Sequence, residues 1–194
     1  MESRKVSSSI EDNITYMTNA PPIGRSFDVV QRNMIIGGKE SAFYCINGFA
    51  KDEDIQEIMN IVLRVSPEQI PSNAPDFSKR FIPHVQVETV SDCEKIITSV
   101  LSGLTCLFID GYEVGFVIDC RSYPARSVDE PQQDKSLRGA RDGFVETIVQ
   151  NTALIRRRIR DPHMIIEMNQ VGESSRSDVA ICYMSDRVDP KVLE

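Results

Sequence analysis

Two apolar runs separated by a short polar turn constrain the fold of this chain more than any other feature. Residues 104–109 are almost entirely apolar and are followed by Asp110-Gly111, after which residues 113–119 form a second run. Two short apolar runs on either side of an Asp-Gly turn are typical of a β-hairpin. The chain is therefore predicted to contain antiparallel β-structure in its middle third.

A second hairpin is predicted nearer the N-terminus. Residues 34–36 and 41–46 are rich in β-branched and aromatic side chains, and Gly37-Gly38 lies between them. Paired glycines permit the positive φ angles that a tight turn between strands requires. Residues 85–90 alternate between apolar and polar side chains, which predicts a half-buried strand.

Helical patterns lie between these predicted strands. Residues 51–63 begin with acidic side chains, which suit the positive end of the helix dipole, and continue with apolar residues at helical spacing. Residues 91–102 open with Ser91 and Glu94 in the spacing of a capping box, so Ser91 is predicted to be the N-cap. Residues 66–79 contain three prolines and are predicted to be a loop.

The C-terminal third predicts one more helix and two more strands. An amphipathic helix is expected over residues 144–160, ended by Pro162, and strands are expected over 164–168 and 177–184. Asp189-Pro190 resembles the start of another helix, four residues before the sequence stops. A domain seldom ends on a helix that has just begun, so we expect a fragment of a longer protein.

The charge distribution is uneven. The whole chain carries a net charge of −7, but residues 135–160 hold seven basic and two acidic side chains, a net +5, which leaves −12 for the remainder. An acidic chain is a poor general binder of nucleic acid, because such binding needs a basic surface. We therefore expect no nucleic-acid partner.

Arginines at the end of the predicted helix are the unusual feature of the basic segment. Arg156 and Arg160 are four residues apart and share a flank of the helix, whereas Arg158 is expected to face solvent or a partner. One interpretation is a solvated helix end matched to its dipole. The other is that the guanidinium groups bind carboxylates of another subdomain or subunit, or anionic lipid heads. The apolar stripe of this helix is predicted to comprise Val145, Ile148, Val149, Thr152, Ile155 and Ile159.

Known catalytic signatures do not occur in the sequence. It lacks a phosphate-binding glycine loop, a zinc-protease motif and a serine-nucleophile elbow, so we expect no enzyme, no cofactor and no metal site. Five cysteines without metal-ligand spacing indicate reduced thiols in a cytosolic compartment. The polar N-terminus does not resemble a signal peptide, and no apolar run reaches the length of a membrane span.

Three segments resemble one known family. Residues 138–146 (RGARDGFVE), 151–162 (NTALIRRRIRDP) and 176–183 (RSDVAICY) are similar to the A-subunit family of bacterial spore germination proteins, the GerA type. Residues 26–30 and 47–52 look most like the stage V sporulation protein AF branch of that family. The sequence departs from the family pattern at Ala140, where proline is usual, and at Glu173-Ser174-Ser175, where basic residues are common.

The resemblance implies an α/β (α+β) fold with two small mixed-sheet subdomains and flanking helices. It divides the chain into a flexible lead (1–26), a first subdomain (27–122), a linker (123–138) and the incomplete start of a second subdomain (139–194). Several membrane spans, absent from this chain, would follow in the whole protein.

The resemblance also implies a role in germination. The domain would lie on the cytosolic side of the spore inner membrane and act in the assembly and regulation of an oligomeric, nutrient-responsive, ion-conducting complex. Its partners would be copies of itself, other germination subunits and anionic lipid heads. An alternative is a ligand-binding module with a cleft between the subdomains. The residues expected to mediate interactions are Arg138, Arg141, Arg156, Arg157, Arg158 and Arg160.

Overall fold

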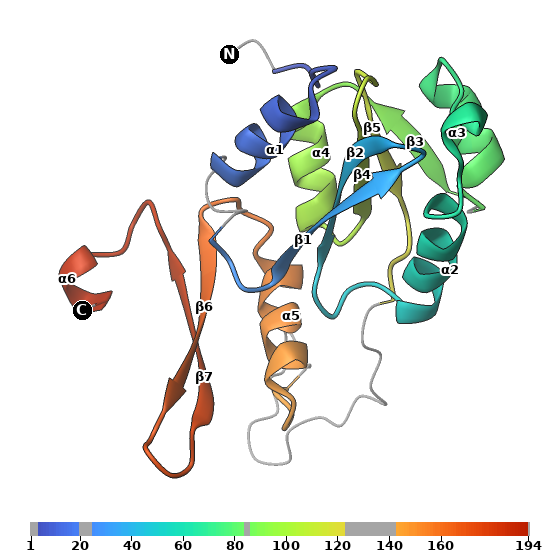
Figure 1. Cartoon of the computed structure of the whole chain (residues 1–194). Coiled ribbons are helices and arrows are strands. Elements are labelled where there is room, and N and C mark those ends of the chain that lie inside the picture. The colour runs from blue at the N-terminus through green and yellow to red at the C-terminus, as the bar shows by residue number, and fades with distance from the viewer. Residues whose placement is uncertain (1–3, 20–24, 84–85, 123–142, 194) are drawn as a thin grey trace, which may run out of the picture.

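A five-stranded antiparallel sheet forms the larger part of the molecule (Figure 1). The computed structural model describes residues 4–19, 25–83, 86–122 and 143–193. The strands lie in the order β1-β2-β4-β5-β3, and each neighbouring pair is antiparallel. The expected α/β fold is confirmed, but the expected mixed strand direction is wrong for this sheet. The strands are β1 (Val29–Ile36), β2 (Lys39–Ile46), β3 (Val87–Val90), β4 (Thr105–Ile109) and β5 (Gly115–Ile118).

Both hairpins predicted from the sequence are present. β4 pairs with β5, and every side chain of these two strands is buried. β1 pairs with β2 over their whole length, and Gly37 and Gly38 make the turn with φ angles of 54° and 75°. Because L-residues with a side chain rarely adopt such angles, the glycine pair fixes the position of this turn.

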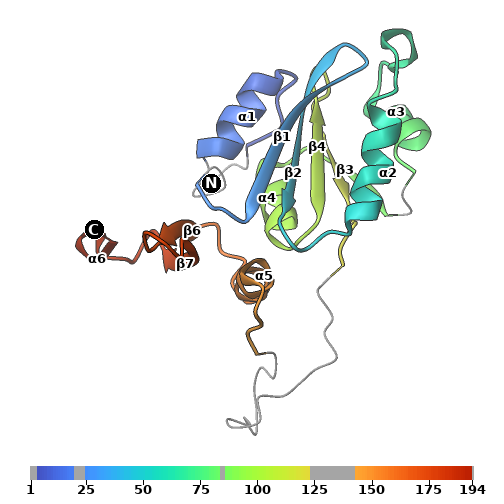
Figure 2. The ribbon, with the colours of Figure 1, turned by 60° about the horizontal axis from the view of Figure 1, so that its bottom comes forward.

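Helices cover both faces of the sheet (Figure 2). On one face, α1 (Ile10–Asn19) and α4 (Cys93–Leu101) contribute to one apolar cluster. On the other face, α2 (Asp52–Val62) and α3 (Ala74–Phe81) pack on a second cluster that includes Phe77. The sheet is therefore buried between two helical layers.

Residues 4–19 do not form the flexible lead that we expected. Ile10 and Met17 of α1 are buried in the core, and Lys5 forms an antiparallel bridge with Asp92. The Val6 N–H donates to the Ser91 carbonyl at 2.9 Å. The N-terminal segment is therefore held against Ser91 and Asp92 at the start of α4. Burial of its apolar residues outweighs its polar composition.

The expected loop over residues 66–79 is also wrong in part. A short 3-10 helix, η1, occupies Pro67–Gln69, and α3 begins at Ala74. Asn73 caps α3 by accepting a hydrogen bond from the Asp76 N–H at 2.9 Å, with Pro75 in the first turn. Proline is favourable there because the first helical N–H groups have no partner within the helix.

The helix that contains the predicted capping box begins slightly later than expected. The N-cap of α4 is Asp92 rather than Ser91, and its carboxylate accepts a hydrogen bond from the Lys95 N–H at 3.1 Å. Ser91 uses its carbonyl to bind Val6 instead. Aspartate and serine are both good N-caps, so the tertiary contact decides between them.

The C-terminal part consists of α5 (Ile148–Arg158), a hairpin of β6 (Met164–Val171) and β7 (Ser177–Met184), and α6 (Pro190–Leu193). In Figure 1 the hairpin projects away from the five-stranded sheet. The predicted strands and the helix start at Pro190 are confirmed. The predicted linker, residues 123–138, lies outside the described residues, and the subdomain boundaries stay predictions. No helix within the described ranges is both long and apolar enough to span a membrane.

Candidate functional site

The helix α5 packs against the end of the five-stranded domain. Ala153 is 1% exposed and belongs to the core cluster that α1 and α4 also form. Gly48, which follows β2, has a φ of 82°, and a Cβ atom there would lie 3.4 Å from both Ala153 Cβ and Val149 Cγ1. Small residues on both sides therefore bring α5 close to the loop after β2.

Arg156 of α5 is completely buried. Its Nε donates to Asp28 Oδ2 at 2.6 Å, and its Nη2 donates to Asp28 Oδ1 at 3.0 Å. Nη2 also contacts the Met164 carbonyl at 2.8 Å, and Nη1 contacts the Asp161 carbonyl at 3.3 Å. A bidentate pairing of this kind uses the planar fork of arginine and fixes its orientation.

Ser26 completes the arrangement around Asp28. Its hydroxyl donates to Asp28 Oδ1 at 2.5 Å and accepts hydrogen bonds from Arg156 Nη2 at 3.1 Å and from the Ile166 N–H at 3.0 Å. The Phe27 N–H donates to the Ile166 carbonyl at 2.8 Å. We call this set of contacts the Arg156 joint. It consists of Ser26, Asp28 and Arg156 with the backbone of Phe27, Asp161, Met164 and Ile166.

The Arg156 joint connects three segments that are distant in sequence. Ser26 and Asp28 precede β1, Arg156 lies on α5, and Met164 and Ile166 belong to β6. A charge removed from water is costly unless it is paired and fully hydrogen-bonded, and this pair meets both conditions. The joint therefore holds the base of the hairpin to the start of the sheet.

Ionisable groups around the joint have shifted pKa values. Hydrogen bonds from the backbone N–H and side chain of His163 lower the pKa of the Asp161 carboxyl. Burial raises the pKa of the Cys182 thiol on β7, and the negative charge of Asp28 adds to that effect while Arg156 opposes it. The two charges of the joint thus act on β7 as well as on β6.

The other predicted interaction residues lie in different surroundings. Arg157, Arg158 and Arg160 are exposed, and Arg160 Nε donates to the Arg157 carbonyl at 3.4 Å. Arg156 and Arg160 were expected on one flank, yet one is buried and the other is exposed. Arg138 and Arg141 lie outside the described residues.

The predicted apolar stripe of this helix is only partly correct. Thr152 of the stripe is buried, but Ile159 is 41% exposed. Ala153 and Arg156, which were not in the predicted stripe, are buried instead. The helix also starts later than residue 144, because the Asn151 side chain binds both the N–H and the carbonyl of Val145. The buried face of α5 is therefore rotated toward Arg156 relative to the predicted stripe.

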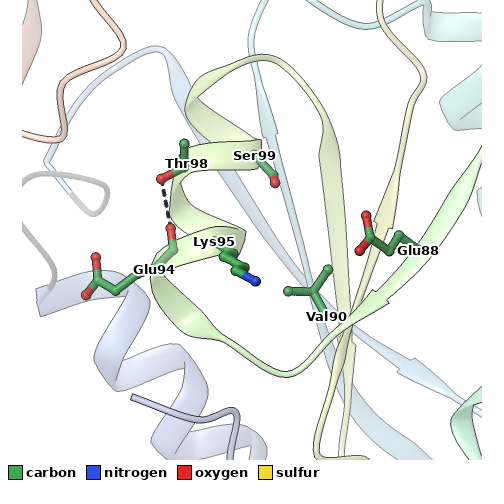
Figure 3. A pocket seen from close by; sticks show the side chains of 6 residues that line it. All are labelled: Glu88, Val90, Glu94, Lys95, Thr98 and Ser99. Atoms are coloured by element: carbon green, nitrogen blue, oxygen red, sulfur yellow. Dashed lines mark hydrogen bonds between the residues drawn. The ribbon is translucent and has the colours of Figure 1, made fainter. Parts of the chain in front are cut away.

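A shallow pocket lies elsewhere, between α4 and β3 (Figure 3). Glu88 and Val90 line it from the strand, and four residues of α4 line it from the other side. The Thr98 hydroxyl donates to the Glu94 carbonyl at 2.9 Å, so that hydroxyl is already engaged. This pocket belongs to the five-stranded domain, not to the boundary between the two predicted subdomains where a cleft was expected. The α4 residues are Glu94, Lys95, Thr98 and Ser99.

Sequence comparison gives the relationship of the chain to known proteins. The family model described as "Bacillus/Clostridium GerA spore germination protein" matches residues 19–194. The chain belongs to this family. The resemblance seen in residues 138–146, 151–162 and 176–183 is confirmed. The GerA family is one of spore germination proteins and not a known enzyme family.

Relatives of this GerA-family chain are longer proteins. Stage V sporulation protein AF of Bacillus subtilis (strain 168) is 40% identical over 183 residues, which are 94% of this chain and 37% of that protein. Spore germination protein KA of the same organism is 27% identical over 194 residues, 97% of this chain and 35% of that protein. The chain thus spans somewhat more than a third of the length of these relatives.

A solved structure has the same fold. The crystal structure of the N-terminal domain of the A subunit of the Bacillus megaterium spore germinant receptor GerK3 matches with a TM-score of 0.75 and 20% identity. The match covers 100% of this chain and 71% of that one. At this level of identity the likeness shows the fold, and it confirms the α/β class expected for a GerA-family chain.

Within this GerA-family chain, sequence reasoning selected Arg156 but missed its partners. Asp28 lies 128 residues before Arg156, and the family resemblance of residues 26–30 does not indicate that Asp28 or Ser26 meets that arginine. One signal was available: Arg156 follows Thr152 by four residues and Ala153 by three, so these three residues share one helix face. Small residues on that face indicated close packing, and an arginine beside them needs a buried acid.

Proposed function

We propose that this chain is the cytosolic N-terminal region of a spore inner-membrane germination protein. In the whole protein it acts in the assembly and regulation of an oligomeric complex that conducts ions in response to nutrients. The observation that carries this proposal is the family match over residues 19–194, together with relatives that include a stage V sporulation protein and spore germination proteins. The surface of the β6–β7 hairpin supports the finer role in assembly.

One face of the β6–β7 hairpin carries apolar side chains in contact with water. Val171, Val179 and Ile181 are 56%, 39% and 41% exposed. Val179 lies opposite Asn169 and Ile181 opposite Glu167, so all three apolar side chains point to the same face. An exposed apolar face of this kind supports a role in contact with another protein surface, because such surface gains free energy when it leaves water.

The basic end of α5 supports the same role. Arg157, Arg158 and Arg160 are exposed close to the base of the hairpin, on a chain whose net charge is −7. Exposed arginines next to an apolar face are typical of protein interfaces, since guanidinium groups bind carboxylates in fixed geometry. The carboxylates that these arginines bind would belong to copies of the chain or to other germination subunits. Guanidinium groups also bind anionic lipid heads, which are a second kind of partner.

The test uses the whole protein in a sporulating Bacillus host. Ile181→Lys places a charge on the hairpin face, and Ile35→Lys, at a position on β1 that is 64% exposed, is the matched control. We expect Ile181→Lys to remain in the spore membrane fraction but to lose the oligomer on native electrophoresis and to slow germination. Ile35→Lys should retain both. Equal behaviour of the two variants would overturn the assembly role.

The basic end of α5 is tested separately. Charge reversal at Arg157 and Arg158 together is expected to weaken the oligomer, with Arg80→Glu on α3 as the control. If the doubly reversed protein assembles and germinates as the parent does, these arginines have no part in assembly. Recovery of the whole protein outside the membrane fraction would contradict the proposed location.

Small-molecule binding between the subdomains is the second candidate. It has less support, because the polar groups at the base of the hairpin already satisfy one another within the Arg156 joint. A thermal-shift panel with amino acids and sugars tests it, since a ligand that binds the folded state raises the melting temperature. A rise in melting temperature that Arg156→Lys abolishes would favour this candidate over assembly.

A further inference from the structure

We propose that the Asp28–Arg156 pair is an orientation lock. It selects one angle of the β6–β7 hairpin relative to the five-stranded sheet, and it contributes little to the stability of the chain compared with an apolar pair of similar size. This inference goes beyond the proposed function, because it concerns the internal geometry of the chain whatever its partners are.

The first reason is that, among the described residues, the hairpin is buried at its base and not beyond it. Met164, Ile165 and Ile166 are at most 4% exposed, whereas the following residues of β6 and those of β7 are half-buried or exposed. Figure 1 shows the two strands extending away from the sheet. A strand rises about 3.3 Å per residue, so a small rotation at the base is amplified along the eight residues of β6.

The second reason is that the apolar contacts at the base have little directional preference. On the side of α5, Gly48 and Ala153 present almost no side-chain relief, and Val149 is the branched side chain beside them. Apolar attraction is proportional to buried area and does not fix an angle. Flat contacts between small residues can slide or rotate with little change in buried area.

The third reason is that the guanidinium group adds direction to the hydrogen bonds that join Ser26 and Phe27 to Ile166. Arg156 binds both oxygens of Asp28 in front of β1, and it also binds the carbonyls of Asp161 and Met164 at the start of β6. Both elements must stand at fixed positions around one planar group for all these bonds to form. Lysine could keep the charge but not the geometry, because its ammonium group has no fork.

The fourth reason is energetic. Removing a charged pair from water costs about as much as the pairing returns, so an apolar pair of similar volume is often equally stable. Removal of one partner alone leaves a buried charge and is strongly destabilising. The side chains of Arg156 and Asp28 are 0% and 1% exposed. We therefore expect the pair to contribute more to selecting one angle of the hairpin than to the free energy of unfolding.

The experiment measures orientation and stability in the same 194-residue chain. Spin labels are placed at Glu57→Cys on α2 and Asp178→Cys on β7, both exposed positions, in a Cys182→Ser background. The four remaining cysteines are buried and do not take the label. A second label pair, Glu11→Cys with Glu57→Cys, lies within the five-stranded domain and serves as the control.

Two variants are compared with the parent, and Asp28→Leu alone is the reference for stability. The double variant Asp28→Leu/Arg156→Met replaces the pair by apolar side chains, and Arg156→Lys keeps the charge without the fork. For both we expect cooperative unfolding and a distance distribution between Glu57 and Asp178 labels about twofold wider than in the parent, since the direction-giving bonds are lost. The control distance should remain as narrow as in the parent.

Either of two results would overturn the proposal. If the Glu57–Asp178 distribution stays narrow in both variants, the apolar contacts set the angle. If the double variant unfolds as early as Asp28→Leu alone, the pair is an ordinary stabilising contact. A double variant that fails to fold at all would also show that the pair is an ordinary stabilising contact. Arg156→Lys then still decides whether the fork sets the angle.

Discussion

The β4–β5 hairpin and the β6–β7 hairpin are the same motif in opposite surroundings. All side chains of β4 and β5 are buried between two layers of helices, whereas only the first three residues of β6 are buried. Both hairpins contain apolar strands, so composition alone does not separate them. What differs is the cover, because helices flank the first hairpin. Among the described residues, the Arg156 joint and the buried side chains of Met164, Ile165 and Ile166 attach the second hairpin at its base. The five-stranded domain is thus stabilised by its own core, and the β6–β7 hairpin depends on its base.

Thiol chemistry should show the largest difference between the two regions. Cys45, Cys93, Cys106 and Cys120 are buried in the five-stranded domain, while Cys182 on β7 is exposed. Burial raises the pKa of Cys45 to about 11 and also raises the pKa of Cys182, so exposure to the reagent is what sets Cys182 apart. At pH 8 we expect one thiol to react with Ellman's reagent more than about a hundredfold faster than the other four, because those need the domain to open.

Denaturation and a single substitution check that Cys182 is the fast-reacting thiol. All five thiols should react rapidly in guanidinium chloride, and Cys182→Ser should remove the fast phase in the native chain. Any fast thiol in that variant would mean that the five-stranded domain opens far more readily than its buried core implies.

Truncation of an aromatic core residue should be the largest stability effect. Phe77 is 0% exposed and lies 5.3 Å from both Phe81 and Phe116 between ring centroids. Phe77→Ala should lower the free energy of unfolding by about 3–5 kcal/mol, because it leaves a cavity in the core. Ile181→Ala on the hairpin, at a side chain that is 41% exposed, should cost less than about 1 kcal/mol. Urea unfolding measures both, and similar losses would show that the hairpin is covered in solution.

Overpacking the centre of the sheet should have a smaller effect. A Cβ atom at Gly115 would lie 2.9 Å from Cys106 Sγ and from Ile96 Cδ1, where no space exists. Gly115→Ala should therefore lower the free energy of unfolding by about 1–3 kcal/mol. Ser177→Ala, at an exposed position of β7, is the matched control and should change it little. An unchanged urea midpoint for Gly115→Ala would mean that the core accommodates the methyl group.

The pH dependence of the joint should be the smallest of these effects. Hydrogen bonds from His163 lower the pKa of Asp161, so its carboxylate stabilises the folded chain above the ordinary pKa of aspartate. That contribution is lost as the pH falls from the ordinary value through the lowered one. The side chain is 37% exposed, which keeps the effect small. Between pH 7 and pH 3, Asp161→Asn should lose slightly less stability than the parent, as measured by urea unfolding at each pH. A steeper loss in the variant would contradict this sign.

Much of the fold was predictable because its signals are local. The Asp110-Gly111 turn, the Gly37-Gly38 turn and the spacing of apolar residues predicted both hairpins of the large sheet and most of its helices. The helix α3 was missed because Pro75 was taken as a breaker, although proline in a first turn favours a helix capped by Asn73. Within the predicted lead, a short helix over residues 10–17 agrees with the sequence, but its burial was not predictable, because it depends on contacts of the segment with distant residues such as Asp92.

The candidate site was predictable only by half. The arginines stood out by charge, and the family resemblance covered the segment that contains them. Which arginine is buried depends on the rotation of α5, and that rotation is set by the close approach of Gly48 and Ala153. The acid that meets Arg156 lies far away in the sequence, and the family-like segment 26–30 that contains it does not indicate this pairing. A pattern on one helix cannot identify a partner that only the tertiary fold brings near.

The separation of Asp28 and Arg156 also sets an order of events during synthesis. The carboxylate is translated 128 residues before the guanidinium group that binds it. At roughly 5–20 residues per second, the ribosome needs about 6–25 seconds to cover that interval. All five strands of the large sheet are made before α5, so the sheet can form while Asp28 remains hydrated beside it. The hairpin can attach only after the strands of the sheet have been made, and its attachment withdraws Asp28 from water.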